Sequence, residues 1–164
     1  MYKDSTGKTT IRVSDFGYST LAADDTEMIF LPKSRPWNAP EHHYMGFDIT
    51  AAKKMDVYSF GMLCLWILVG NRLQADTPTV TIDGRAKLVS FDGPPAQHIR
   101  TELEQLKDED RVGDVACQLM QAMPGFSDEL KARLNKFFSL ATTLNAENRT
   151  SDFGKLLECI SQEG

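Results

Sequence analysis

The stretch KKMDVYSFGMLCLWILV at residues 53–69 contains the most hydrophobic run of this 164-residue chain. Its length suits a helix, and apolar side chains fall on nearly every side of that helix. A helix without a polar face is typically a buried, central one, so we expect residues 53–69 to form the middle of the fold. Gly70 and Asn71 provide a plausible end. The apolar run is shorter than the roughly 18 residues that a membrane span needs.

Amphipathic patterns after this stretch predict four more helices. In each one, apolar residues recur at spacings of three and four, which gives a single buried stripe. We expect Ser127 to cap the third of these helices, and Thr150 or Ser151 to cap the fourth. The four apolar sets are, in order, Ile99, Leu103 and Leu106; Val112, Val115, Ala116, Leu119, Met120 and Met123; Leu130, Leu134, Phe137, Phe138 and Ala141; and Phe153, Leu156, Leu157 and Ile160.

Two small β elements are also predicted. An alternating run that follows a turn signal favours a short hairpin within residues 1–14. Two β-like runs around Asp83-Gly84 favour a second hairpin within residues 79–91. The predicted fold class is therefore mainly α, with two β-hairpins, in a single domain spanning residues 1–164.

Composition excludes several classes of function. The net charge is -5 and no basic run occurs, which argues against nucleic-acid and membrane partners. The N-terminus lacks the apolar core of a signal peptide, so we expect an intracellular, cytoplasmic protein. Cys64, Cys117 and Cys159 are far apart, which favours reduced, mostly buried thiols over a zinc site.

Gly7-Lys8-Thr9 matches the end of a phosphate-binding P-loop. The complete motif needs a glycine five residues before Gly7, and Tyr2 stands there. We therefore interpret Gly7 as a hairpin turn.

The tripeptide Asp-Phe-Gly occurs twice, at residues 15–17 and 152–154. We interpret the second copy as the beginning of a helix, with Phe153 in the core. The first copy is followed by Ala-Pro-Glu at 39–41, DVYSFG at 56–61 and NAENRT at 145–150. These four elements, in this order, resemble the protein kinase family from its metal-binding loop to the end of its C-terminal lobe. The resemblance covers nearly the whole chain.

The resemblance implies a role for each residue of the first copy. Asp15 would hold Mg²⁺ against the phosphates of ATP. Phe16 would pack under the site, and Gly17 would let the backbone turn sharply. Without the resemblance, Asp15 would be an ordinary turn residue after a strand.

Residues 15–41 would be the activation segment of such a domain, and part of it would form the groove for a protein substrate. The groove residues nearest the acceptor would be Ser34, Arg35, Pro36 and Trp37. Lys33-Ser34 stands where the Ser/Thr members often have Gly-Thr, which leaves the substrate class open. Ser19, Thr20, Thr26 and Ser34 are candidate phosphorylation sites or solvated hydroxyls.

Three further residues have structural roles in the family. The resemblance implies a buried ion pair between Glu41 and Arg149, for which the planar guanidinium is well suited. Asp56, at the expected start of the central helix, would brace the catalytic loop; its other interpretation is a plain helix cap.

The glycine-rich loop, the ATP-binding lysine and the catalytic H-R-D-x-x-x-x-N loop do not occur in this sequence. In family order they would precede Met1, so no catalytic base is present, and ATP and Mg²⁺ are expected only in a complete domain. The resemblance implies ATP-dependent phosphoryl transfer to protein, of Ser/Thr type, with this chain an inactive C-terminal fragment. Two alternatives stay open: a pseudokinase-like scaffold or protein-binding module, and an unrelated helical regulatory domain.

Overall fold

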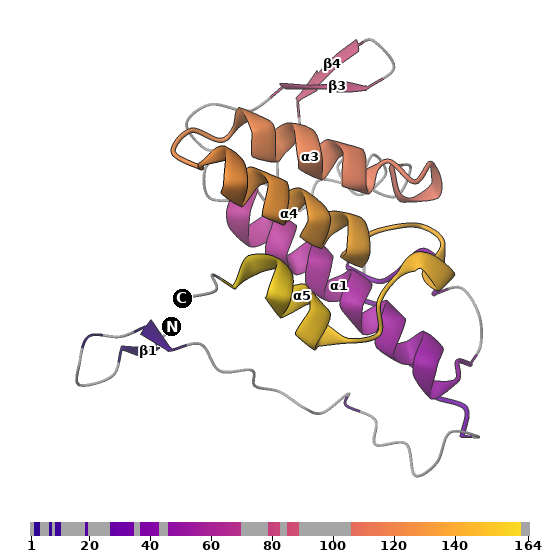
Figure 1. Ribbon diagram of the computed structural model, residues 1–164. Helices are drawn as coiled ribbons and strands as arrows, with labels where there is room; N and C mark the ends of the chain where they lie inside the picture. Colours follow the sequence, from indigo (N-terminus) through magenta and orange to yellow (C-terminus); the bar gives the residue numbers. More distant parts are fainter. Residues whose placement is uncertain are drawn as a thin grey trace.

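The computed structural model describes residues 2–3, 7, 9–10, 19, 27–34, 37–42, 46–69, 79–82, 85–88 and 106–161. Within these residues the protein is mainly α, as predicted (Figure 1). The elements are, in order, β1 (Tyr2–Lys3), β2 (Thr9–Thr10), α1 (Ile49–Val69), β3 (Thr79–Ile82), β4 (Arg85–Leu88), α3 (Val112–Ala122), α4 (Asp128–Ala141), the 3₁₀ turn η2 (Ala146–Asn148) and α5 (Phe153–Ile160).

The central helix α1 begins four residues earlier than the sequence predicted. The Asp48 carboxylate accepts a hydrogen bond from the backbone N–H of Ala51 at 2.7 Å, which is the geometry of an N-cap. Asp56 therefore lies in the third turn of the helix, and its expected position at the helix start was wrong. Residues 49–52 have no strong apolar pattern, so the pattern did not indicate that they are helical. The capping residue Asp48 was the signal for the earlier start.

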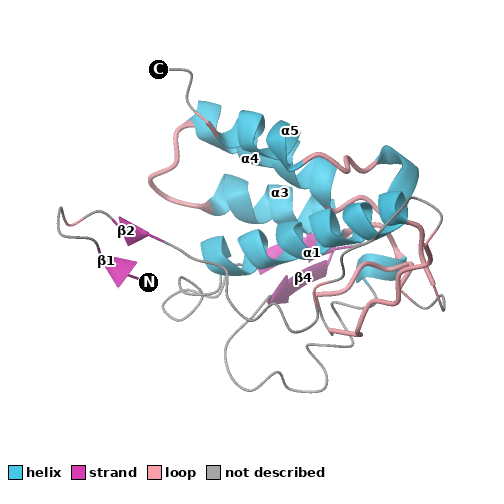
Figure 2. Cartoon of the chain, turned by 90° about the horizontal axis from the view of Figure 1, so that it is seen from below, coloured by secondary structure: helices cyan, strands magenta, loops and turns pink. Residues whose placement is uncertain are grey.

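The helices pack as layers around α4. Helix α3 contacts one side of α4, while α5 and α1 contact it elsewhere (Figures 1 and 2). The close approach of α1 and α4 depends on Gly61, where an added Cβ would lie 2.8 Å from the Cβ of Ala141 and 2.9 Å from Cγ2 of Thr142. Those distances are shorter than real Cβ contacts, so a small residue is required at this crossing.

The periodic patterns correctly predicted the buried faces of α3 and α4. All five predicted core residues within α3 are buried, and so are Leu134, Phe137, Phe138 and Ala141 of α4. Ser127 caps α4 as predicted, since its hydroxyl oxygen accepts from the N–H of Leu130 at 3.2 Å. Of the earliest amphipathic set, residues 99–105 lie outside the described residues.

The last helix, α5, departs from its predicted pattern. Asp152 caps it by accepting from the N–H of Gly154 at 2.8 Å, so neither Thr150 nor Ser151 is the cap. Leu156 and Cys159 are its buried residues, whereas Phe153 is exposed and was wrongly placed in the core. This second Asp-Phe-Gly sequence is therefore a capped helix start.

The β elements form two antiparallel pairs among the described residues. Tyr2 and Lys3 pair with Thr10 and Thr9, within the first hairpin that the sequence predicted. Strands β3 and β4 pair in a register that places Ile82 opposite Arg85. That register leaves two residues for the connection, as a tight turn requires, although Asp83-Gly84 itself lies outside the described residues.

One side of α1 carries apolar side chains that are exposed in the described structure. Phe60, Leu63 and Ile67 lie at spacings of three and four on one face, and their exposed fractions are 36%, 41% and 55%. The prediction that α1 is buried on every side is therefore wrong. Phe60 contacts the ring of Phe153 at a centroid distance of 5.5 Å, which extends this apolar surface onto α5. Even so, no helix within the described residues is long and apolar enough to cross a membrane.

Candidate functional site

The structure describes only some of the residues for which the sequence motifs predict chemical roles. Asp15, Phe16 and Gly17 lie outside the described residues, as do Arg35 and Pro36. The predicted magnesium ligand and most of the predicted substrate groove therefore remain predictions. Within the expected activation segment, residues 15–41, the structure describes residue 19, residues 27–34 and residues 37–41, together with surfaces that hold its end.

The segment before α1 is closed at its base by backbone hydrogen bonds. Ile29 and Phe47 exchange N–H···O bonds of 2.7 and 3.0 Å, which brings the two sides of the segment together. Within it, the carbonyl of Ser34 accepts from the N–H groups of Trp37 and Asn38. The Trp37 ring meets Trp66 of α1 edge-on at 6.1 Å, whereas Ser34 is exposed. Trp37 therefore attaches this turn to α1.

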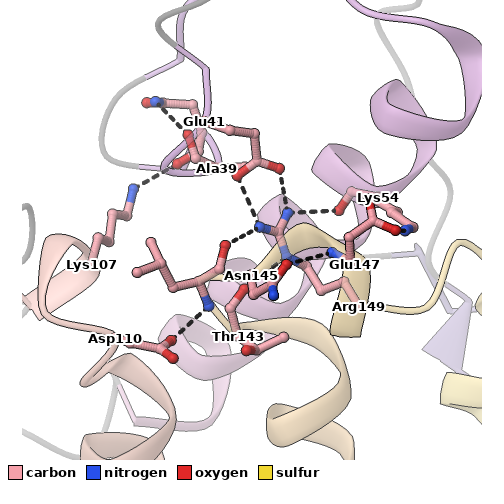
Figure 3. A network of polar contacts seen from close by, with 11 residues as sticks. Ala39, Glu41, Lys54, Lys107, Asp110, Thr143, Asn145, Glu147 and Arg149 are labelled. Carbon is pink, nitrogen blue, oxygen red and sulfur yellow. Dashed lines mark hydrogen bonds and ion pairs between the residues drawn. The ribbon is translucent and has the colours of Figure 1, made fainter.

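The structure brings together Glu41 and Arg149, which are 108 residues apart (Figure 3). Nη1 of Arg149 donates to Oε1 of Glu41 at 2.6 Å, and Nη2 donates to Oε2 at 2.8 Å. This two-point geometry matches the planar guanidinium to the carboxylate. The Arg149 side chain is completely buried, and 20% of the Glu41 side chain is exposed. The pair is thus mostly removed from water.

Arg149 also hydrogen-bonds to the backbone around it. Its Nε donates to the carbonyl of Thr143 at 2.8 Å, and Nη2 donates to the carbonyl of Leu144 at 3.0 Å (Figure 3). A weaker bond of 3.3 Å reaches the carbonyl of Lys54 in α1. One side chain therefore ties the loop before η2, helix α1 and the end of the expected activation segment into a single unit.

A second buried cation holds the same segment, and sequence reasoning missed it. Nζ of Lys107 donates to the carbonyl of Asn38 at 2.7 Å, and Lys107 is 5% exposed. Lys107 Nζ and Arg149 Cζ lie 5.6 and 5.0 Å from the ring centroid of Tyr58, within cation–π range. Burial raises the pKa of the Tyr58 phenol well above its usual range, although Arg149 opposes that shift.

A hollow of about 200 Å³ lies between this segment and α1. Its polar lining comprises Ser34, Asn38, His42, Asp56 and Ser59. Asp56 is exposed at one side of the hollow, yet partial burial raises the pKa of its carboxyl. No described residue forms an ion pair or hydrogen bond with its carboxylate. Among the described residues, Asp56 therefore contributes an unpaired carboxylate to the lining of this hollow.

A second hollow, of about 230 Å³, lies between α3 and the end of α4. Asp110 lines it, but its carboxylate already accepts from the N–H of Leu144 at 2.6 Å. Burial and the neighbouring Asp114 raise the pKa of the Cys117 thiol, so this thiol is not an activated nucleophile. The part of the chain that the structure describes holds no cluster of three or more potential metal ligands.

Part of the chain is similar in sequence to a plant receptor-like kinase. The chain is 38% identical over 61 residues to the leucine-rich repeat receptor-like protein kinase TDR of Arabidopsis thaliana. The match covers 37% of this chain and 6% of that protein. No protein-family model and no solved structure matches the chain. The chain thus has a weak, partial similarity to a receptor-like kinase.

Proposed function

We propose that this chain is the C-terminal lobe of a protein-kinase-like domain, which in its complete form transfers phosphoryl groups from ATP to protein hydroxyls. The observation that carries the proposal is the bidentate pair between Glu41 and Arg149. The kinase resemblance requires this contact, and neither residue's neighbours would otherwise suggest it. The partial similarity to a receptor-like kinase supports the same interpretation.

The geometry also suits the task of holding a substrate-binding segment. Phosphoryl transfer depends mainly on positioning and electrostatics, so the segment that receives the acceptor must be rigid. Buried, charge-assisted hydrogen bonds from Arg149 and Lys107 hold residues 38–41 in place. Ser34 lies on the exposed side of the same segment, where a protein substrate could reach it. In this proposal Asp15 holds the magnesium of Mg-ATP.

The two Asp-Phe-Gly copies provide a matched test. The chain is extended upstream through the preceding coding sequence, and Mg-ATP-dependent phosphorylation of a generic protein substrate is measured. We expect Asp15→Asn to reduce the rate by at least about a hundredfold, because a metal ligand for the phosphates is lost. Asp152→Asn removes only a charge at the start of α5, because an asparagine oxygen can still cap the helix, so this variant should retain most of the activity. Equal activities for the two variants would refute the proposed role of Asp15.

The chain of 164 residues alone should not bind Mg-ATP with micromolar affinity, because the lysine and the catalytic loop are not part of it. Isothermal titration calorimetry measures this directly, and a clear micromolar isotherm would contradict the proposal.

A pseudokinase-like scaffold is the second candidate, and the exposed apolar side chains Phe60, Leu63 and Ile67 favour it. Contiguous apolar surface is often a contact site for another protein. The extended protein discriminates between the candidates: a scaffold would fold and bind partners, while neither Asp15→Asn nor the removal of magnesium would change its function.

A further inference from the structure

A turn that ends the helical residues 106–108 places an aspartate where glycine is the usual residue. The N–H of Arg111 donates to the carbonyl of Leu106 at 2.8 Å, and the N–H of Asp110 donates to the carbonyl of Lys107 at 3.1 Å. This pair of bonds is a Schellman motif, in which the residue at the position of Asp110 is left-handed. Asp110 has a φ of 55°, and glycine would adopt that angle with less strain. The backbone of this turn therefore does not require a carboxylate.

The side chains of Asp110 and Lys107 extend to the two sides of the buried ion pair (Figure 3). Oδ1 of Asp110 accepts from the N–H of Leu144 at 2.6 Å, and the carbonyl of Leu144 in turn accepts from Nη2 of Arg149 at 3.0 Å. Nζ of Lys107 donates at 2.7 Å to the carbonyl of Asn38, in the segment that carries the glutamate of the pair. The turn at residues 107–110 thus spans the pair and contacts both segments that form it.

The bond from Lys107 fixes the end of a second turn, at residues 34–38. The N–H groups of Trp37 and Asn38 both donate to the carbonyl of Ser34, at 2.8 and 3.0 Å. The carbonyl of Asn38 then accepts from Lys107, so the last residue of this turn is held through both its N–H and its carbonyl. Ser34 is exposed, and with Trp37 it belongs to the predicted substrate groove. The orientation of that groove therefore depends on Lys107.

The burial of Lys107 favours positioning over stability as its main contribution. Lys107 is 5% exposed, and removing an ammonium group from water costs solvation free energy. An apolar side chain of similar volume is often as stable at a buried charged position, or more stable. An apolar side chain could also pack on the ring of Tyr58, over which the ammonium group lies, but it could not donate to a carbonyl. A directional donor is what lysine adds here.

We propose that Lys107 is a positioning residue for the protein substrate, and that Asp110 fixes the turn from which Lys107 acts. The two contacts hold residues 34–38 in the orientation that receives the substrate. When either contact is lost, a smaller fraction of molecules has the groove in that orientation, and the apparent affinity falls by that fraction. This role rests on the proposed function, and it concerns the binding of the protein substrate alone.

Amide hydrogen exchange in the 164-residue chain tests the connection without ATP. Asp110→Gly preserves the left-handed turn and removes the carboxylate. We expect exchange of the N–H groups of Trp37 and Asn38 to accelerate by about threefold or more, while exchange at Lys131 near the start of α4 stays unchanged. Asp108→Asn removes the same charge from an exposed neighbour and should change none of these rates. Equal exchange at Asn38 in the two variants, or equal acceleration at Lys131, would overturn the inference.

Steady-state kinetics test the role in substrate binding, with the chain extended upstream through the preceding coding sequence. Lys107→Met retains a long side chain but removes the donor. We expect Lys107→Met and Asp110→Gly to raise KM for the protein substrate by about fivefold, with kcat and KM for ATP within about twofold of the natural values. Asp108→Asn should leave all three constants unchanged. A purely structural role would instead lower the active fraction, and with it kcat, at an unchanged KM.

The kinetic outcomes separate this inference from the proposed function. If the extended protein is active and both variants leave KM for the protein substrate unchanged, the inference is overturned while the proposed function stands. If the extended natural protein transfers no phosphoryl group, the proposed function is refuted, and the substrate role of Lys107 with it.

Discussion

Replacing Arg149 by alanine should strongly destabilise the protein, because it breaks a buried pair from one side only. The Glu41 carboxylate would lose the two hydrogen bonds that Arg149 donates to it, and the carbonyls of Thr143 and Leu144 would each lose one. Removing one partner of a buried ion pair typically costs about 3–5 kcal/mol. Some 20% of the Glu41 side chain reaches water, which solvates the stranded charge and favours the lower part of that range.

Urea denaturation followed by circular dichroism measures the change in the free energy of unfolding. We expect a loss of about 3–4 kcal/mol, which is a large share of the roughly 5–15 kcal/mol that stabilises a typical domain. At this chain length, such a loss lowers the melting temperature by roughly 6–16 °C. Arg149→Lys should recover only part of the loss, since an ammonium group cannot form the two parallel bonds.

Glu147→Gln is the matched control for this prediction. Glu147 belongs to the same loop and pairs with Lys54 at 3.5 Å, but 86% of its side chain is exposed. An exposed pair contributes about 0–1 kcal/mol, so the variant should unfold almost as the natural protein does. If Arg149→Ala costs no more than Glu147→Gln, the claim that Arg149 ties this segment to the helices is refuted.

Three further predictions concern α1 and its neighbours. Gly61→Ala should lower the free energy of unfolding by about 1–3 kcal/mol through overpacking against α4. At Gly113 an added Cβ would meet only Oγ1 of Thr142, at 3.9 Å, which is an ordinary van der Waals contact. Gly113→Ala should therefore be neutral or stabilising by up to about 1 kcal/mol in the same denaturant titration. The pKa of the Asp56 carboxyl is raised, so its charge destabilises the fold at pH values above that pKa. Asp56→Asn should therefore melt at the same or a higher temperature than the natural protein at pH 7. Asp48→Ala removes the cap of α1 and should lower the free energy of unfolding by about 1 kcal/mol. Burial raises the pKa of the Cys64 thiol to about 11. The stability that the buried neutral thiol contributes should be complete below about pH 9 and lost as the pH rises through 11. A thiol reagent such as Ellman's should react slowly with Cys64 at pH 8.

The local parts of this fold were predictable from sequence, whereas contacts between distant segments were not. Spacings of three and four along a helix report which side is apolar, so the buried faces of α3 and α4 could be predicted. The same pattern does not report whether a partner covers that side. Phe60 and Phe153 are apolar residues in helices, yet both are exposed. Burial depends on what packs against a helix, and that is decided by residues far away in the sequence.

The polar residues of the candidate site illustrate the same limit. Glu41 and Arg149 were singled out only because their motifs resemble those of a known family. Lys107 has no such motif, and lysine is ordinarily a surface residue, so no local signal predicted its buried contact with Asn38, 69 residues away. No local pattern marks His42 either, and it is buried on the wall of the hollow beside α1.

The ion pair and the hollow use adjacent residues of one segment, and this explains why both sit where they do. Arg149 holds Glu41 in place, so the next residue, His42, is held on the wall of the hollow instead of turning toward water. A site with unpaired polar atoms lowers stability, and a neighbouring buried pair can hold the segment in place despite that loss. Arg149→Ala removes this anchor and should lower the free energy of unfolding, whereas Asp56→Asn leaves the anchor in place and should not lower it.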